Sequence, residues 1–75
     1  MTHSKIYEDH RTLSRVELAA ELHRVAAQLE SGGDVSYGEL GSIAVPEEIQ
    51  REVEIEQTKD GAGFKFDIEF KWIAR

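Results

Sequence analysis

The chain has 75 residues, with nine lysine and arginine residues, fifteen aspartate and glutamate residues and no cysteine. A chain of this length forms one small domain, whose core contributes only roughly 3–5 kcal/mol of net stability. A formal net charge of -6 disfavours nucleic acid and anionic membranes as partners, and the lack of cysteine excludes disulfides and zinc–cysteine sites.

The first twelve residues are mostly polar and are interpreted as an N-terminal arm. Two alternatives stay open for this arm: a frayed segment, or a short extra edge strand at residues 5–8. The arm lacks the basic and apolar regions of a secretion signal, and no stretch of the chain reaches the roughly 18 apolar residues that a membrane span requires. Together with the absence of cysteine, this predicts a cytoplasmic protein.

A helix is predicted over residues 15–30. Ser14 followed three residues later by Glu17 is the pattern of a capping box, and Gly32-Gly33 supplies the flexible backbone that ends helices. Apolar residues recur with the helical period between these signals, which predicts one buried face: Leu18, Leu22, Val25 and Leu29. Polar residues such as Glu21, Arg24 and Gln28 are expected to be largely turned away from it.

The remaining chain predicts antiparallel strands at about 34–37, 42–45, 51–58 and 63–73. The last strand places large apolar residues on every second position and therefore on one face: Phe64, Phe66, Ile68, Phe70 and Trp72. A turn of either Asp60-Gly61 or Lys59 to Ala62 joins the last two strands. Either turn sets Ile55 opposite Phe66, because an even-numbered loop keeps both apolar rows on one face.

These elements predict an α+β fold: a single domain over residues 13–75, with the helix on one face of a four-stranded antiparallel meander. Such a sheet is roughly 19 Å wide and one helix only about 10–12 Å, so the helix cannot cover all of it. The end of the last strand is then covered either by the arm or by another chain. The candidate interaction residues are Ile6, Tyr7, Phe70, Trp72 and Ile73.

No pattern of catalytic, cofactor-binding or metal-binding residues is present. His3, His10 and His23 share no metal-ligand spacing, the glycines match no phosphate-binding motif, and no serine lies in a nucleophile motif. The glutamates at 47, 48, 52, 54 and 56 are interpreted as a solvated face with Lys65 and Lys71 as counter-charges. We therefore expect no enzyme, no cofactor and no metal.

Three segments are similar to those of a described family: Leu13-Ser14-Arg15-x-Glu17, Val45-Pro46 and Ile68-Glu69-Phe70-Lys71-Trp72. They resemble the amphi-Trp domain, over roughly residues 5–73. The resemblance implies a small prokaryotic domain named for its amphipathic end and tryptophan, without established catalytic residues to transfer. It also favours residues 5–8 being part of the domain.

The function predicted from the sequence is a non-enzymatic protein–protein interaction or assembly module. Its partner is a second copy, forming a homodimer, or a larger protein complex; nucleic acid and membranes are not expected partners. The alternative is a small-ligand-binding domain, with a pocket at a dimer interface or between helix and sheet. The residues expected to line the latter pocket are Leu22, Tyr37 and Phe66.

Overall fold

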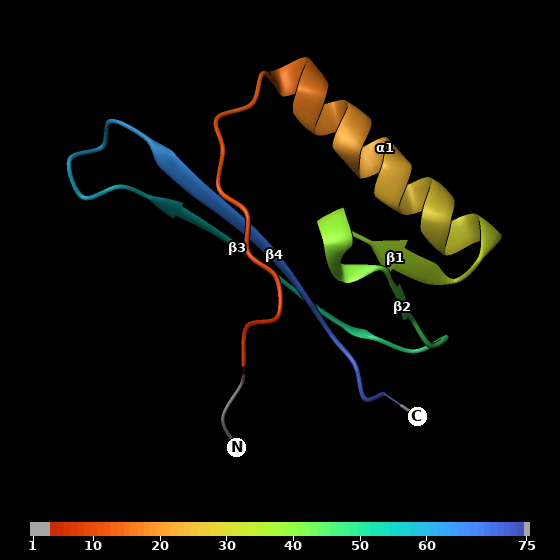
Figure 1. Cartoon of the computed structure of the whole chain (residues 1–75). Helices are drawn as coiled ribbons and strands as arrows, with labels where there is room; N and C mark the ends of the chain where they lie inside the picture. The colour runs from red at the N-terminus through yellow and green to blue at the C-terminus, as the bar shows by residue number, and fades with distance from the viewer. Residues whose placement is uncertain (1–3, 75) are drawn as a thin grey trace. The chain divides into compact units, whose positions relative to one another are not determined.

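The computed structural model describes residues 4–74, so His3 lies outside the described part (Figure 1). Over these residues the elements are α1 (Arg15–Ser31), β1 (Asp34–Ser36), a 3-10 turn η1 (Gly38–Leu40), β2 (Ser42–Ala44), β3 (Gln50–Gln57) and β4 (Phe64–Lys71). The predicted α+β class is confirmed.

The described strands form two two-stranded antiparallel sheets, β1–β2 and β3–β4. The chain divides correspondingly into two compact units, residues 1–45 and 46–75. The single four-stranded meander is therefore not confirmed, and the packing of the helix on such a sheet stays a prediction. Pro46, which lacks an amide donor, stands at the division between the units and is unsuited to continuing β2 as a paired strand.

Helix α1 begins at the predicted capping box. The Glu17 amide donates to the Ser14 hydroxyl at 3.0 Å, and the Ser14 amide donates to the Glu17 carboxylate at 2.9 Å. At the other end, the amides of Gly32 and Gly33 both donate to the Gln28 carbonyl. Gly33 then adopts a φ of 65°, which turns the chain into β1 and favours glycine.

A row of polar side chains attaches α1 to β1. Ser36 exchanges two hydrogen bonds with the Gln28 amide group, at 2.8 and 3.2 Å, and its carbonyl accepts from Arg24 at 3.0 Å. The guanidinium carbon of Arg24 lies 4.7 Å from the centre of the Tyr37 ring, whose hydroxyl donates to Glu21 at 3.2 Å. Glu21, Arg24 and Gln28, spaced three and four residues apart, lie along one side of the helix.

This polar attachment corrects one prediction about the helix. The row expected to be turned away from the sheet is the one that contacts β1. Burial of the apolar face against the second unit stays a prediction; Leu18, Leu22 and Leu29 are 46%, 55% and 40% exposed. Helical periodicity identifies which residues share a face, but it does not identify what that face contacts. Burial of Tyr37, followed by the nearby Glu21 carboxylate, raises the pKa of the Tyr37 hydroxyl.

The arm contacts the rest of the first unit through Tyr7. Its ring lies 5.8 Å from the Tyr37 ring at an interplanar angle of 47°, and a side-chain carbon at Gly38 would come within 2.9 Å of it. Residues 4–14 form neither helix nor strand, so the edge-strand alternative at residues 5–8 is not what the structure shows. Glycine at 38 is required both by this close approach and by its φ of 50°.

The β3–β4 hairpin has the predicted register, with Ile55 opposite Phe66, Val53 opposite Ile68 and Glu56 opposite Lys65. Its turn confirms the longer of the two alternatives. The Thr58 amide donates to the Gly63 carbonyl at 2.9 Å, and the Thr58 carbonyl accepts from the Gly61 amide at 2.8 Å. The Asp60 carboxylate accepts from the Thr58 hydroxyl at 2.6 Å and from the Ala62 amide at 2.9 Å, which fixes the turn.

Candidate interaction surface

One face of the β3–β4 hairpin carries large apolar side chains from both strands, and we call it the aromatic face: Val53, Ile55, Phe64, Phe66, Ile68 and Phe70. Arg51 and Gln57 occupy the ends of the β3 row on the same side. Phe64, Phe66 and Phe70 are 75%, 64% and 50% exposed, and no residue between 4 and 74 is buried. The face therefore lacks a cover within its own unit.

The exposed area is large for a hairpin of this size. The three phenylalanines alone expose about 400 Å², on a scale of about 200 Å² for each aromatic side chain. Burying that area contributes on the order of 10 kcal/mol of transfer free energy before entropic costs. An isolated two-stranded hairpin is only marginally stable in water and needs a third strand or a packed element. The aromatic face is thus the surface that requires a partner.

Trp72 extends this face beyond the end of β4. Because Gln50 lies opposite Lys71, continuing the register by one residue sets Trp72 opposite Ile49. Trp72 is half-buried and lines an open hollow of about 640 Å³. Besides Trp72, both apolar and polar or charged residues line the hollow: Pro46, Glu47, Glu48, Ile49, Gln50, Lys71 and Ile73.

The predicted interaction residues come from both units. Phe70, Trp72 and Ile73 lie in the hairpin unit, where Ile73 is exposed; Ile6 and Tyr7 lie in the first unit, and Ile6 is exposed too. Coverage of Phe70 and Trp72 by the arm stays a prediction. So does the ligand pocket, since Leu22 and Tyr37 belong to the first unit and Phe66 to the second.

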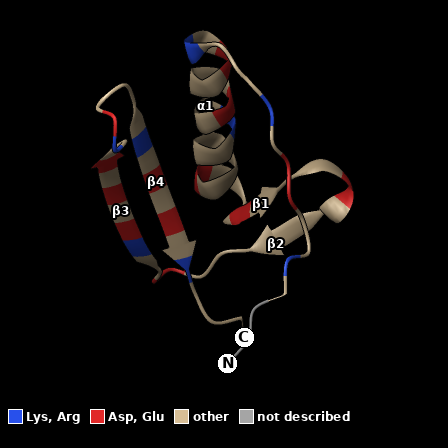
Figure 2. Ribbon diagram, turned by 90° about the vertical axis from the view of Figure 1, so that its left-hand side faces the viewer, with Lys and Arg blue, Asp and Glu red and all other residues tan. Residues whose placement is uncertain are grey.

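The opposite, polar face of the hairpin sets like charges directly across from each other. Glu52 lies opposite Glu69, and Glu54 lies opposite Asp67. The hydrogen bond and negative charge of Glu52, joined by the charges of Glu56 and Asp67, raise the pKa of Glu54. Figure 2 shows this pattern, with acidic bands along β3 and basic bands near both ends of β4.

The two lysines of β4 pair along their own strand. Lys65 lies 3.5 Å from the Asp67 carboxylate, and Lys71 lies 3.5 Å from that of Glu69. No ion pair among residues 4–74 reaches the glutamates of β3. The two lysines were predicted to be counter-charges to those glutamates. They pair with Asp67 and Glu69 of their own strand instead.

Comparison with known proteins identifies the family of this chain. The family model described as the Amphi-Trp domain matches residues 1–75, the whole chain. The chain belongs to the Amphi-Trp family. The resemblance found in the sequence is thereby confirmed. No curated protein and no solved structure matches this Amphi-Trp chain.

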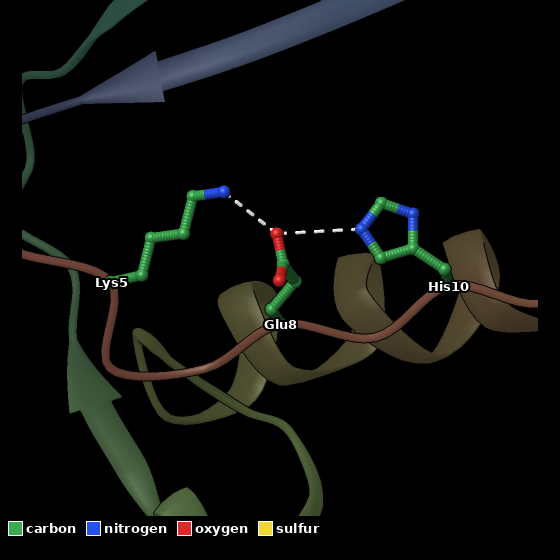
Figure 3. A network of polar contacts seen from close by, with 3 residues as sticks. All are labelled: Lys5, Glu8 and His10. Atoms are coloured by element: carbon green, nitrogen blue, oxygen red, sulfur yellow. Dashed lines mark hydrogen bonds and ion pairs between the residues drawn. The ribbon is translucent and has the colours of Figure 1, made fainter.

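A cluster of polar side chains in the arm of the Amphi-Trp chain is exposed. In the arm, Lys5 and His10 lie 2.7 and 3.4 Å from one oxygen of Glu8 (Figure 3). The hydrogen bond from Lys5, with a smaller contribution from His10, lowers the pKa of Glu8. Within residues 4–74, no three histidine, aspartate or glutamate side chains gather as metal ligands, and no helix has the length and apolar character to cross a membrane.

Sequence reasoning missed the cluster of Glu21, Arg24 and Tyr37. Its signal is present in the sequence as a polar row at helical spacing that includes Gln28. Such a row is common on solvated helix faces, and only the contact with residues 36 and 37 distinguishes it. The cluster holds α1 to β1 and presents no nucleophile or general base in a cleft, so we assign it a structural role.

Proposed function

We propose that this Amphi-Trp chain is a non-enzymatic assembly module whose partner is another polypeptide, in the first place a second copy of itself. The aromatic face and Trp72 form the contact surface. One observation carries this proposal: a two-stranded hairpin displays six large apolar side chains on one face, and its own unit does not cover them.

The size and composition of the surface support the proposal. A standard interface buries about 800 Å² on each partner, and the phenylalanines supply about half of that before Val53, Ile55, Ile68 and Trp72 are added. Tryptophan is among the residue types most enriched where binding energy concentrates. The acidic residues of β3 and β4 lie on the opposite face of the hairpin, which leaves the aromatic face free of acidic groups.

The module needs neither a cofactor nor a catalytic residue. The absence of cysteine is consistent with the cytoplasm as its compartment. The net charge of -6 makes nucleic acid an unfavourable partner.

The hollow beside Trp72 supports a second candidate function, the binding of a small ligand. Its volume of about 640 Å³ falls within the range of ligand pockets, and it combines an aromatic residue with charged groups. A metabolite panel in a thermal-shift assay tests this candidate, because a ligand that binds the folded chain raises its melting temperature. A panel without any shift contradicts the presence of a ligand of the classes tested.

A single substitution tests the assembly module. Trp72→Asp sets a charge on the contact surface, and we expect it to lower the mass in solution from dimer to monomer, measured by light scattering. The helix content, measured by circular dichroism, is expected to stay unchanged. The matched control is Val16→Asp, which adds the same charge at an exposed residue in the first turn of α1, outside the hairpin.

Two results would contradict the assembly proposal. If Trp72→Asp unfolds the chain, Trp72 belongs to the interior of one copy. If the variant keeps the mass of the wild-type dimer, the contact lies elsewhere. A loss of mass in the Val16→Asp control would show that added charge, and not position, is responsible.

A further inference from the structure

Each strand of the hairpin has one unpaired edge. Among the residues that the structure describes, β3 and β4 pair only with each other. Unpaired amides and carbonyls at a strand edge accept another strand readily, and a hairpin gains independent stability from a third strand. The two edges differ in charge, and this difference indicates which of them can pair with a second copy.

The β3 edge opposes self-pairing. Its polar side carries Glu52, Glu54 and Glu56 on consecutive same-face positions. When two β3 strands pair, their apolar rows must lie on the same side of the sheet. Their register can therefore change only in steps that keep polar residues opposite polar residues. Every register in which the glutamate rows overlap sets glutamate opposite glutamate, which destabilises the pair.

The β4 edge carries both signs, in the order Lys65, Asp67, Glu69, Lys71. In one antiparallel register, Lys65 lies opposite Glu69 of the second copy, and this contact occurs twice. The same register sets Phe64 opposite Phe70 and Phe66 opposite Ile68 of the second copy. Such cross-strand aromatic and opposite-charge pairs are the ones that stabilise sheets.

We propose that β4 of one copy pairs antiparallel with β4 of a second copy, about a two-fold axis at Asp67. The inference rests on the proposed assembly function and specifies its geometry. The two hairpins form one four-stranded sheet, in which the β4 rows of the two aromatic faces contact each other along the shared edge. One like-charge contact, Asp67 with its symmetry mate, is outweighed by the two lysine–glutamate contacts and by the four apolar pairs.

Symmetry favours this pairing over the head-to-tail alternative. Pairing β4 with β3 of another copy would set Asp67 or Glu69 against the glutamates of β3. It would also leave one β3 edge and one β4 edge free, which can pair again in the same way and continue into a filament. The β4–β4 pair is closed, since both remaining edges are the acidic β3 strands.

A charge swap tests the pairing without changing net charge. The double variant Glu56→Lys with Lys65→Glu keeps opposite charges facing each other inside the hairpin, but it makes residues 65, 67 and 69 of the β4 edge acidic. Both intermolecular lysine–glutamate contacts become repulsive. We expect the dissociation constant of the dimer to rise at least about tenfold, measured by sedimentation equilibrium.

The matched control is Glu54→Lys with Lys59→Glu. It makes the same two kinds of substitution, but it leaves the four charges of β4 intact and moves a glutamate into the turn. We expect this variant to dimerise at least as tightly as the wild type. Contacts between Ile55 and Phe66 in NMR spectra show whether the hairpin is retained in both variants.

Amide hydrogen exchange in the wild type gives an independent measurement that does not depend on any variant folding. We expect the outward-pointing amides of β4 to become protected as concentration rises, while those of β3 keep exchanging. Two results would overturn the edge pairing. One is a dimer in which the outward-pointing amides of β4 still exchange freely. The other is a charge-swap variant that dimerises normally while its hairpin is intact. If Trp72→Asp still dissociates that dimer, the assembly function stands and only this geometry is wrong; a wild type that is monomeric at every concentration overturns both.

Discussion

Glu54 is the residue where the charge pattern of the hairpin has its clearest consequence. The neighbouring Glu52, through a hydrogen bond and its charge, raises the pKa of the Glu54 carboxyl above its ordinary value of 4.5. A raised pKa means that the ionised form is disfavoured in the folded chain. The resulting destabilisation is fully present above the raised pKa and is lost as the pH falls through it towards 4.5.

The variant Glu54→Gln removes this repulsion while it keeps the shape of the side chain. We expect it to be more stable than the wild type at neutral pH, and the difference to shrink as the pH approaches the ordinary carboxyl value. Urea unfolding of both proteins at neutral and at mildly acidic pH measures this. An equal gain at both pH values would show that packing or strand propensity, and not charge, is responsible.

At the scale of the elements, the capping box determines where α1 begins. Replacing Ser14 by alanine removes the hydroxyl that accepts from the Glu17 amide, and we expect a loss of about 1 kcal/mol in the free energy of unfolding. Thr12→Ala is the control, because it removes a hydroxyl just outside the helix. Equal losses in the two variants would contradict a specific capping role.

The same box makes the helix sensitive to acid. Hydrogen bonds from Ser14 lower the pKa of the Glu17 carboxyl below 4.5, so its contribution to stability is present above that value and is lost as the pH falls through the lowered pKa. We expect the stability difference between Glu17→Ala and the wild type to narrow in strong acid, because the bond from the Ser14 backbone amide is the largest cause of the lowered pKa. A difference that is constant over this range would mean that Glu17 does not contribute.

Local signals in the sequence were sufficient for the elements and for the hairpin register. The helix start follows from Ser14 and Glu17, and the pairing of Ile55 with Phe66 follows from the turn at Asp60-Gly61 and from alternation. The surroundings of α1 were not predictable, because periodicity does not say which element a face contacts. Its attachment to β1 depends on Gln28 and Ser36, which are eight residues apart.

The candidate surface was only partly predictable for the same reason. Alternation identified the apolar row of β4, and the register placed Val53 and Ile55 beside it. Whether another element covers that row depends on long-range contacts, which the sequence pattern does not contain. The hollow beside Trp72 also depends on the path of residues 46–49, a segment without periodicity.

At the scale of the whole molecule, each of the two units over residues 4–74 carries an apolar face that its own residues do not cover. The leucines of α1 and the aromatic face of the hairpin are both exposed. The net charge of -6 keeps separate copies apart at long range, so an association must derive its free energy from apolar contacts between these faces and from strand pairing. Small domains commonly gain missing stability by forming oligomers.

The most direct test of this account is the absolute mass of the wild-type chain, measured by light scattering from low micromolar to millimolar concentration. We expect a transition from the chain mass of 8.5 kDa to about 17 kDa, twice that value. A constant mass of 8.5 kDa over the whole range would contradict self-assembly through the aromatic face.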